Sequence, residues 1–183
     1  MINIVIVFPN ISDGQKIKNL LVRNGFEVAG VCSSGAQAMS ITDELDYGVV
    51  VCGYKFNDMI YSELYAELED GFQMLLVASP GKLSDGVEDG VVAVDMPLKA
   101  NDMIETLDEM VQALEKVRKQ DRKKPRQRNI AKQAIIDKAK EVLMKNRNMS
   151  EEEAHRYIEK TAMDECVKKI EVAEKIIERY KYD

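Results

Sequence analysis

Five short apolar runs alternate with amphipathic segments over the first 117 residues, and this alternation constrains the fold more than any other feature of the chain. The runs are Ile2 to Val7, Glu27 to Cys32, Val49 to Cys52, Met74 to Val77 and Val91 to Val94. Short runs rich in β-branched residues are typical of parallel strands that are covered on both faces. The segments 14–23, 34–45 and 58–68, and most clearly the one after residue 100, have helical patterns. The sequence therefore predicts a flavodoxin-like α/β fold, with a five-stranded parallel sheet wound by right-handed crossovers.

The charges of the 183 residues are unevenly distributed. Residues 1–117 hold 7 basic and 19 acidic residues, a net charge of −12, whereas residues 118–183 hold 19 basic and 13 acidic residues, a net charge of +6; together they give −6. This asymmetry favours a polyanionic partner for the second part, although salt-tolerant helix surfaces would also produce it. We predict a domain over 1–117 with an extended last helix, a basic linker or hinge over 118–128, and a three-helix domain over 129–183.

The composition argues against several classes of protein. No apolar run approaches the roughly 20 residues of a membrane span, and the start of the chain does not resemble a signal peptide, so we expect a cytoplasmic protein. Cys32, Cys52 and Cys166 lack the spacing of a disulfide framework or a metal site, and His155 is the single histidine. The loop 8–14 has neither a dinucleotide fingerprint nor a P-loop pattern. We therefore predict no enzymatic activity, no metal and no cofactor.

The first 117 residues resemble a receiver domain in element count, in length and in the step Met96-Pro97, where receivers usually carry Lys-Pro. Phosphoryl transfer to a receiver needs acidic ligands for magnesium, an acceptor aspartate, a hydroxyl and a lysine. The corresponding positions hold Phe8-Pro9-Asn10 for the acidic pair, Cys52 for the acceptor, Ala78 or Ser79 for the hydroxyl and Met96 for the lysine. Asp58 is the nearest carboxylate, but it lies about six residues past the strand. We predict a degenerate receiver with Cys52 at the phosphoacceptor position, not phosphorylated by the usual aspartyl mechanism.

The last third of the chain contains three short helical segments with a recognisable set of residues. They cover 135–144, 149–158 and 160–163, followed by Val172-Ala173-Glu174 and Ile176-Ile177. An Ala-Lys pair ahead of Leu-Met, a Ser-Glu-Glu-Glu-Ala helix start and an Ala-Met pair resemble the ANTAR domain in type, order and spacing. That family is a small helical RNA-binding module, which usually follows a receiver and controls transcription by antitermination. The resemblance implies hairpins in leader transcripts as the RNA partner.

The second of these helices has a defined start. Ser150 and Glu153 form a predicted capping box, so the helix should begin at Glu151. Its residues Ala154 and Ile158 recur at helical spacing and should face the core of the small domain.

A heptad-like seam follows residue 100. Its members are Met103, Leu107, Met110, Leu114 and Val117, spaced alternately by four and three residues. The pattern fits either a dimerising coiled coil or simply the buried face of the last receiver helix. Related antiterminators join receiver and RNA-binding helices by a long helix that pairs, which favours a homodimer by resemblance. Within the basic block 118–128, Pro125 should kink or break a continuous helix.

Cations cluster on the remaining faces of the C-terminal helices, and such cations supply salt-dependent affinity for phosphates. We predict that RNA is contacted by Lys140, Arg156, Lys160, Lys168 and Lys169, with Ala162 and Met163 shaping the surface. The alternatives are that Ala162 and Met163 belong to the core and that any one lysine is merely solvated.

Two other functions compete with RNA binding. The chain could be a signalling dimer whose helical tail binds another protein, or a DNA-binding response regulator with a helix-turn-helix domain. A DNA-reading helix should start with Arg, Asn or Gln, whereas 151–153 and 164–165 are acidic. An upstream signalling protein is a possible further partner, and its identity does not follow from the sequence.

Overall fold

The computed structural model describes residues 2–121 and 127–180. The chain separates into two compact units, Met1–Lys123 and Lys124–Asp183, and each has its own apolar core. We therefore describe each unit by itself. The predicted hinge at Pro125 lies outside the described residues. Among the described helices, none has the length and apolar character needed to cross a membrane.

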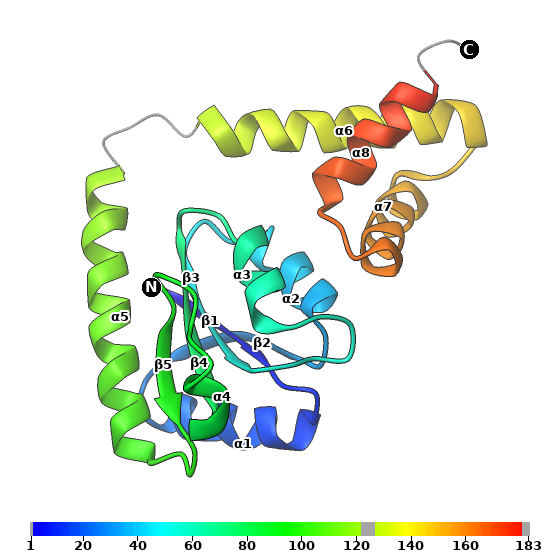
Figure 1. Ribbon diagram of the computed structural model, residues 1–183. Coiled ribbons are helices and arrows are strands. Elements are labelled where there is room, and N and C mark those ends of the chain that lie inside the picture. Colours follow the sequence, from blue (N-terminus) through cyan, green and yellow to red (C-terminus); the bar gives the residue numbers. More distant parts are fainter. Residues whose placement is uncertain (1, 122–126, 181–183) are drawn as a thin grey trace. The chain divides into compact units, whose positions relative to one another are not determined.

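The first unit is built on a five-stranded parallel sheet (Figure 1). The strands are β1 (Asn3–Val7), β2 (Glu27–Cys32), β3 (Gly48–Gly53), β4 (Phe72–Ala78) and β5 (Val92–Asp95). Their order in the sheet is β2-β1-β3-β4-β5, and all pairs are parallel. The helices are α1 (Ile11–Arg23), α2 (Gly35–Thr42), α3 (Tyr61–Glu67), α4 (Pro80–Leu83) and α5 (Ala100–Asp121). This is the predicted flavodoxin-like fold, and its fourth helix has only four residues.

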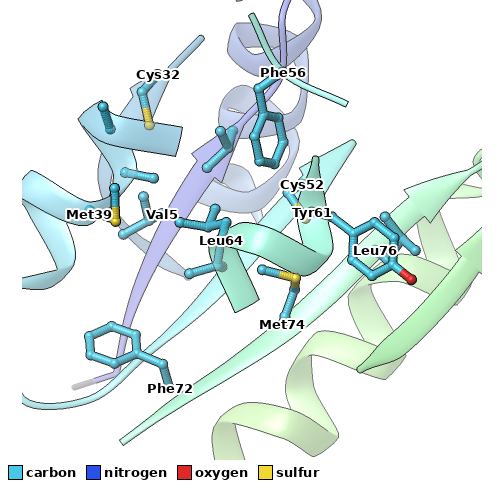
Figure 2. Close-up of a cluster of buried hydrophobic side chains, with 14 of the residues drawn as sticks. Val5, Cys32, Met39, Cys52, Phe56, Tyr61, Leu64, Phe72, Met74 and Leu76 are labelled. Atoms are coloured by element: carbon cyan, nitrogen blue, oxygen red, sulfur yellow. The ribbon is translucent and has the colours of Figure 1, made fainter. Parts of the chain in front are cut away.

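The alternation of side chains along each strand divides the core into two layers. Ile4 and Ile6 of β1 pack in one cluster with residues of α1 and α5, whereas Val5 and Val7 pack in the other with residues of α2 and α3. Figure 2 shows the second cluster, in which Cys52 lies among apolar side chains. The continuously apolar runs in the sequence follow from this arrangement, because both faces of the central strands are covered.

Side-chain hydrogen bonds explain where two helices differ from the prediction. Helix α1 begins three residues before residue 14, because the Asn10 side chain accepts from the Ser12 amide at 2.9 Å. Helix α3 begins three residues after Asp58. The two carboxylate oxygens of Asp58 accept instead from the amides of Gly35 and Ala36, at 2.8 and 2.9 Å. Asp58 therefore holds the start of α2 from the loop before α3.

Helix α5 uses the predicted seam to cover the sheet. Met103, Leu107, Met110 and Leu114 are buried in the same cluster as Ile4 and Ile6. These four side chains pack within one chain, so they are not available to a second one. Their spacing fits the second interpretation of the seam, the buried face of the helix that covers the sheet. Val117, the last member, is 42% exposed.

The second unit consists of three helices, α6 (Gln127–Arg147), α7 (Glu151–Glu165) and α8 (Lys169–Arg179) (Figure 1). Its core is small, and five of its eight buried members are alanine or valine. They are Ala139, Leu143, Ala154, Ile158, Ala162, Val172, Ala173 and Ile176. The capping box is confirmed: the Glu153 amide donates to Ser150 Oγ at 3.2 Å, and the Ser150 amide donates to the Glu153 carboxylate at 2.7 Å. Asn148 turns the chain between α6 and α7 with a φ of 54°, a conformation that asparagine tolerates better than most residues.

Candidate nucleic-acid interface

Helix α7 has one face in the core and another in solvent. The buried face consists of Ala154, Ile158 and Ala162. Arg156, Lys160 and Met163 are exposed and recur at the spacing of one helix face. We call these three residues the α7 strip. The strip brings together three of the seven predicted contact residues on one continuous exposed surface.

The two cations of the α7 strip differ in their surroundings. The Arg156 guanidinium donates to the Glu152 carboxylate one turn earlier, and both side chains are largely exposed. An exposed pair of this kind is worth little and exchanges readily for another anion. Lys160 forms no ion pair with any described residue. Lys160 is therefore the predicted cation whose charge is most available to a phosphate.

Lys140 lies in a different environment from the one we predicted. Its side chain is only 13% exposed, and its ammonium lies 2.8 Å from Asp137 and 3.1 Å from Glu151. The hydrogen bond to Asp137 raises the pKa of Lys140 and, in return, lowers the pKa of Asp137. Because Glu151 starts α7, Lys140 links α6 to the beginning of α7. Its charge is committed to two carboxylates, and we leave it out of the proposed contact surface.

Burial also removes two other predicted residues from the exposed surface. Lys169 is 5% exposed, and its ammonium lies 3.6 Å from Glu159, which also lies 3.3 Å from His155. Ala162 is 4% exposed and belongs to the core, as the alternative interpretation held. Lys168 is half-buried and precedes the first turn of α8. The prediction of an exposed contact surface is thereby corrected for Lys169 and Ala162.

A cluster that the sequence did not indicate joins the ends of α6 and α8 to the middle of α7. The Arg147 guanidinium lies 5.0 Å from the centroid of the Tyr157 ring, and Arg147 Nε donates to the Tyr180 hydroxyl at 2.8 Å. Arg147 is exposed, and both tyrosines are half-buried. The three residues are separated by 10 and 23 positions, so no local periodicity relates them. The only signal of this cluster in the sequence is an arginine at the predicted end of a helix together with two tyrosines in the later helices.

The helical domain itself carries no net charge. Residues 129–183 hold 12 lysines and arginines and 12 aspartates and glutamates, whereas 118–128 holds 7 basic residues and one acidic residue. The positive charge that the sequence assigns to the second part of the chain is therefore concentrated in the basic block 118–128.

At the carboxyl end of the sheet in the first unit, the places where a receiver is expected to hold its phosphorylation groups hold Phe8, Cys52, Ala78 and Met96. Cys52 is fully buried, and burial raises the pKa of its thiol well above the ordinary range. The Phe8 ring lies beside Gly53, where an added methyl group would approach it to 3.3 Å. Ala78 is buried at the end of β4, and Met96 is exposed after β5. These side chains offer no oxygen ligands, so they do not fit the magnesium site of a phosphorylated receiver.

Comparison with known proteins assigns a family to the second unit. Residues 126–177 match the model of the ANTAR domain. The match includes the capping box, the α7 strip and Arg147. No curated protein matches this sequence.

Solved structures relate the first unit to receivers. A response regulator receiver domain protein from Clostridium thermocellum is 18% identical with a TM-score of 0.58, over 64% of this chain and 99% of that one. A CheY-like receiver domain protein from Methanospirillum hungatei JF-1 is 20% identical with a TM-score of 0.54, over 63% and 98%. A DNA-binding response regulator of the LuxR family from Staphylococcus aureus is 20% identical with a TM-score of 0.53, over 60% and 98%. At such identities the similarity shows the fold. The chain thus combines a domain with the receiver fold and a C-terminal ANTAR domain.

Proposed function

We propose that this protein is a transcription antitermination regulator that binds stem-loop RNA in leader transcripts through its ANTAR domain. The observation that carries the proposal is the match of residues 126–177 to that family, whose members bind RNA. The exposed cations of the α7 strip support it, because cations on a helix surface neutralise phosphates of the RNA. The unpaired bases of an RNA loop stay accessible to neighbouring side chains. Met163, 38% exposed, adds an apolar contact to the same strip.

The receiver domain acts in this proposal without aspartyl phosphorylation. A phosphorylated receiver needs acidic magnesium ligands and an acceptor aspartate at the strand ends. Phe8, Cys52 and Ala78 occupy three of these places. Asp58, the nearest carboxylate, already accepts two backbone hydrogen bonds at the start of α2. Control would then come from a partner, a ligand or the abundance of the protein.

Dimerisation remains part of the proposal, but it needs a different surface from the predicted seam. Met103 and Leu114 are buried against the sheet. Ile130 near the start of α6 is 69% exposed, and Ala131 and Ala134 are exposed beside it. Pairing of this part of α6 between two chains would cover these apolar side chains. Light scattering of the full chain should then give twice the 20.7 kDa mass of one chain.

The α7 strip can be tested by reversing the charge of Lys160. RNA that copurifies with the full-length protein is identified, and its hairpins are used in gel shifts at two salt concentrations. Lys160→Glu should weaken hairpin binding by about tenfold, because it replaces a phosphate contact by repulsion. Duplex DNA of matched length serves as the competing ligand.

The matched control is Lys99→Glu in the receiver domain, where the side chain is 78% exposed before α5. It makes the same change in net charge on the other unit and should leave RNA binding unchanged. Equal losses in both variants would show that net charge alone governs binding. Equal affinity of the wild type for duplex DNA would favour the DNA-binding alternative, and no affinity for either nucleic acid would refute the proposed function.

A further inference from the structure

Arg147, the last residue of α6, has a guanidinium that contacts two tyrosines and is exposed to solvent. One side faces the Tyr157 ring at 5.0 Å from the centroid. The Nε–H group donates to the Tyr180 hydroxyl at 2.8 Å, and this hydrogen bond is the main cause of the raised pKa of Arg147. Because Arg147 is exposed, the side of the guanidinium away from Tyr157 faces solvent. The result is a planar cation at the surface that is held by an aromatic ring and a hydroxyl.

We propose that Arg147 and Tyr157 form a stacking site for one unpaired base of the bound RNA. This inference rests on the proposed function and assigns the base contact within it. Unpaired bases of RNA stack on aromatic rings and on arginine guanidinium planes. Within the described part of the ANTAR domain, Arg147 and Tyr157 are the pair that combines a ring with a cation above it. The base would lie on the solvent face of the guanidinium, or between it and the rim of the ring.

Tyr180 prepares the site for stacking. Without its hydroxyl, the guanidinium could rotate about the end of a long flexible side chain. The hydrogen bond from Nε fixes the plane before RNA arrives, so less conformational freedom is lost on binding. Tyr180 is therefore a positioning residue, and its contribution to stacking should be smaller than that of Arg147.

The stacking site adjoins the cations that would hold the flanking phosphates. Tyr157 lies three residues before Lys160 on α7, and residues at this spacing are neighbours on a helix surface. Arg156 precedes Tyr157 directly. A nucleotide with its base on Arg147 could thus have its phosphate near Lys160. Stacking and charge at adjacent positions favour a single-stranded loop over a continuous duplex, whose bases are not accessible to stack.

The test uses the full-length protein and two synthetic RNAs with the same stem, one closed by a loop of adenosines and the other a blunt duplex. Arg147→Lys keeps the positive charge but removes the planar group. We expect the affinity of this variant for the looped RNA to fall by about tenfold, which is the loss expected when one base no longer stacks. Its affinity for the duplex should stay the same. Tyr180→Phe should lose about two- to threefold on the looped RNA alone. Lys145→Ala, an exposed cation on the same helix end, is the control and should change both affinities by the same small factor.

A second measurement does not depend on how the variants fold. The Arg147 Nε–H and Tyr157 ring resonances of the wild type are followed by NMR as each RNA is added, and they should shift with the looped RNA and not with the duplex. Unchanged resonances, or equal loss of both affinities in Arg147→Lys, would overturn the stacking site while leaving RNA binding intact. Absence of binding of the wild type to either RNA would instead refute the proposed function and this inference with it.

Discussion

Truncation of Ile158 should destabilise the ANTAR domain without affecting the domain with the receiver fold. Ile158 is 1% exposed and, with Leu143, is one of the two large side chains of this core that are fully buried. Most of the remaining buried residues are smaller, so few neighbours can move to fill the space. Removal of a fully buried isoleucine side chain costs about 2–5 kcal/mol, and the scarcity of large neighbours places Ile158→Ala at about 3–4 kcal/mol. A domain of this size is stable by about 3–8 kcal/mol. The variant should therefore lose roughly 40% of that stability or more.

Native-state hydrogen exchange of the full-length protein measures this change. Amides of α7 and α8 should exchange about 100- to 1,000-fold faster in Ile158→Ala, since each 1.4 kcal/mol corresponds to a factor of ten. Amides of β3 and β4 should keep their protection, because those strands belong to separate clusters. Met163→Ala is the matched control on the same helix. Its side chain is partly exposed, so its loss should cost about 1 kcal/mol or less.

Two results would refute this reasoning. Equal acceleration in Ile158→Ala and Met163→Ala would mean that the buried and exposed faces of α7 have been assigned wrongly. Equal loss of protection in α7 and in β3 would mean that the two units unfold together, despite their separate cores.

Two further predictions concern the capping box and the strand ends. Ser150→Ala should destabilise the ANTAR domain by about 1 kcal/mol at pH 7 in urea titrations. Hydrogen bonds from Ser150 lower the pKa of Glu153 below its ordinary value of 4.5, so this stabilisation is present above that value and is lost as pH falls through the lower folded pKa. The backbone amide of residue 150 is the main donor to Glu153, and it is kept in Ser150→Ala but has no carboxylate to bind in Glu153→Gln. The stability difference between wild type and Glu153→Gln should therefore shrink towards pH 3, and a constant difference would contradict it. If Cys52 stands at the acceptor position, as proposed, incubation with acetyl phosphate and Mg²⁺ should leave the intact mass unchanged; a stable phosphoryl adduct would refute this part of the proposal.

The sequence predicts the sheet well because each strand is specified by its own residues. A continuous run of β-branched residues indicates a strand covered on both faces, and no distant residue is needed to recognise it. The start of α7 is equally local, since Ser150 and Glu153 are three positions apart. Where all the determining residues lie within one turn or one strand, prediction from the sequence succeeds.

The seam on α5 fails for a different reason. Spacings of three and four residues place Met103, Leu107 and Leu114 on one face of a helix, but they do not say what covers that face. Either a sheet or a helix of a second chain could cover an apolar face with this pattern. The sheet lies in the same chain and needs a cover on that side, so it takes precedence over a partner.

The candidate site was predicted least well, because its side chains depend on partners far along the chain. The ammonium of Lys140 lies against Glu151, eleven residues later, and that of Lys169 lies against Glu159, ten residues earlier. Lysines are rarely buried unless they are paired, and the pairing cannot be seen without the fold. Arg147 and Tyr180 are separated even further.

The distribution of charge and structure suggests that affinity and selectivity reside in different segments. A domain with 12 cations and 12 anions cannot by itself displace many counterions from RNA, and several of its cations are already paired. The block 118–128 holds the excess positive charge, so the salt dependence of binding should come largely from it. Charge in such a block attracts any nucleic acid, hairpin or duplex alike. Discrimination must then come from the few exposed groups whose positions the helices fix, namely Lys160 and the stacked pair of Arg147 and Tyr157. This division explains why Arg147→Lys, which leaves every charge in place, should weaken binding of the looped RNA while leaving the salt dependence of binding unchanged.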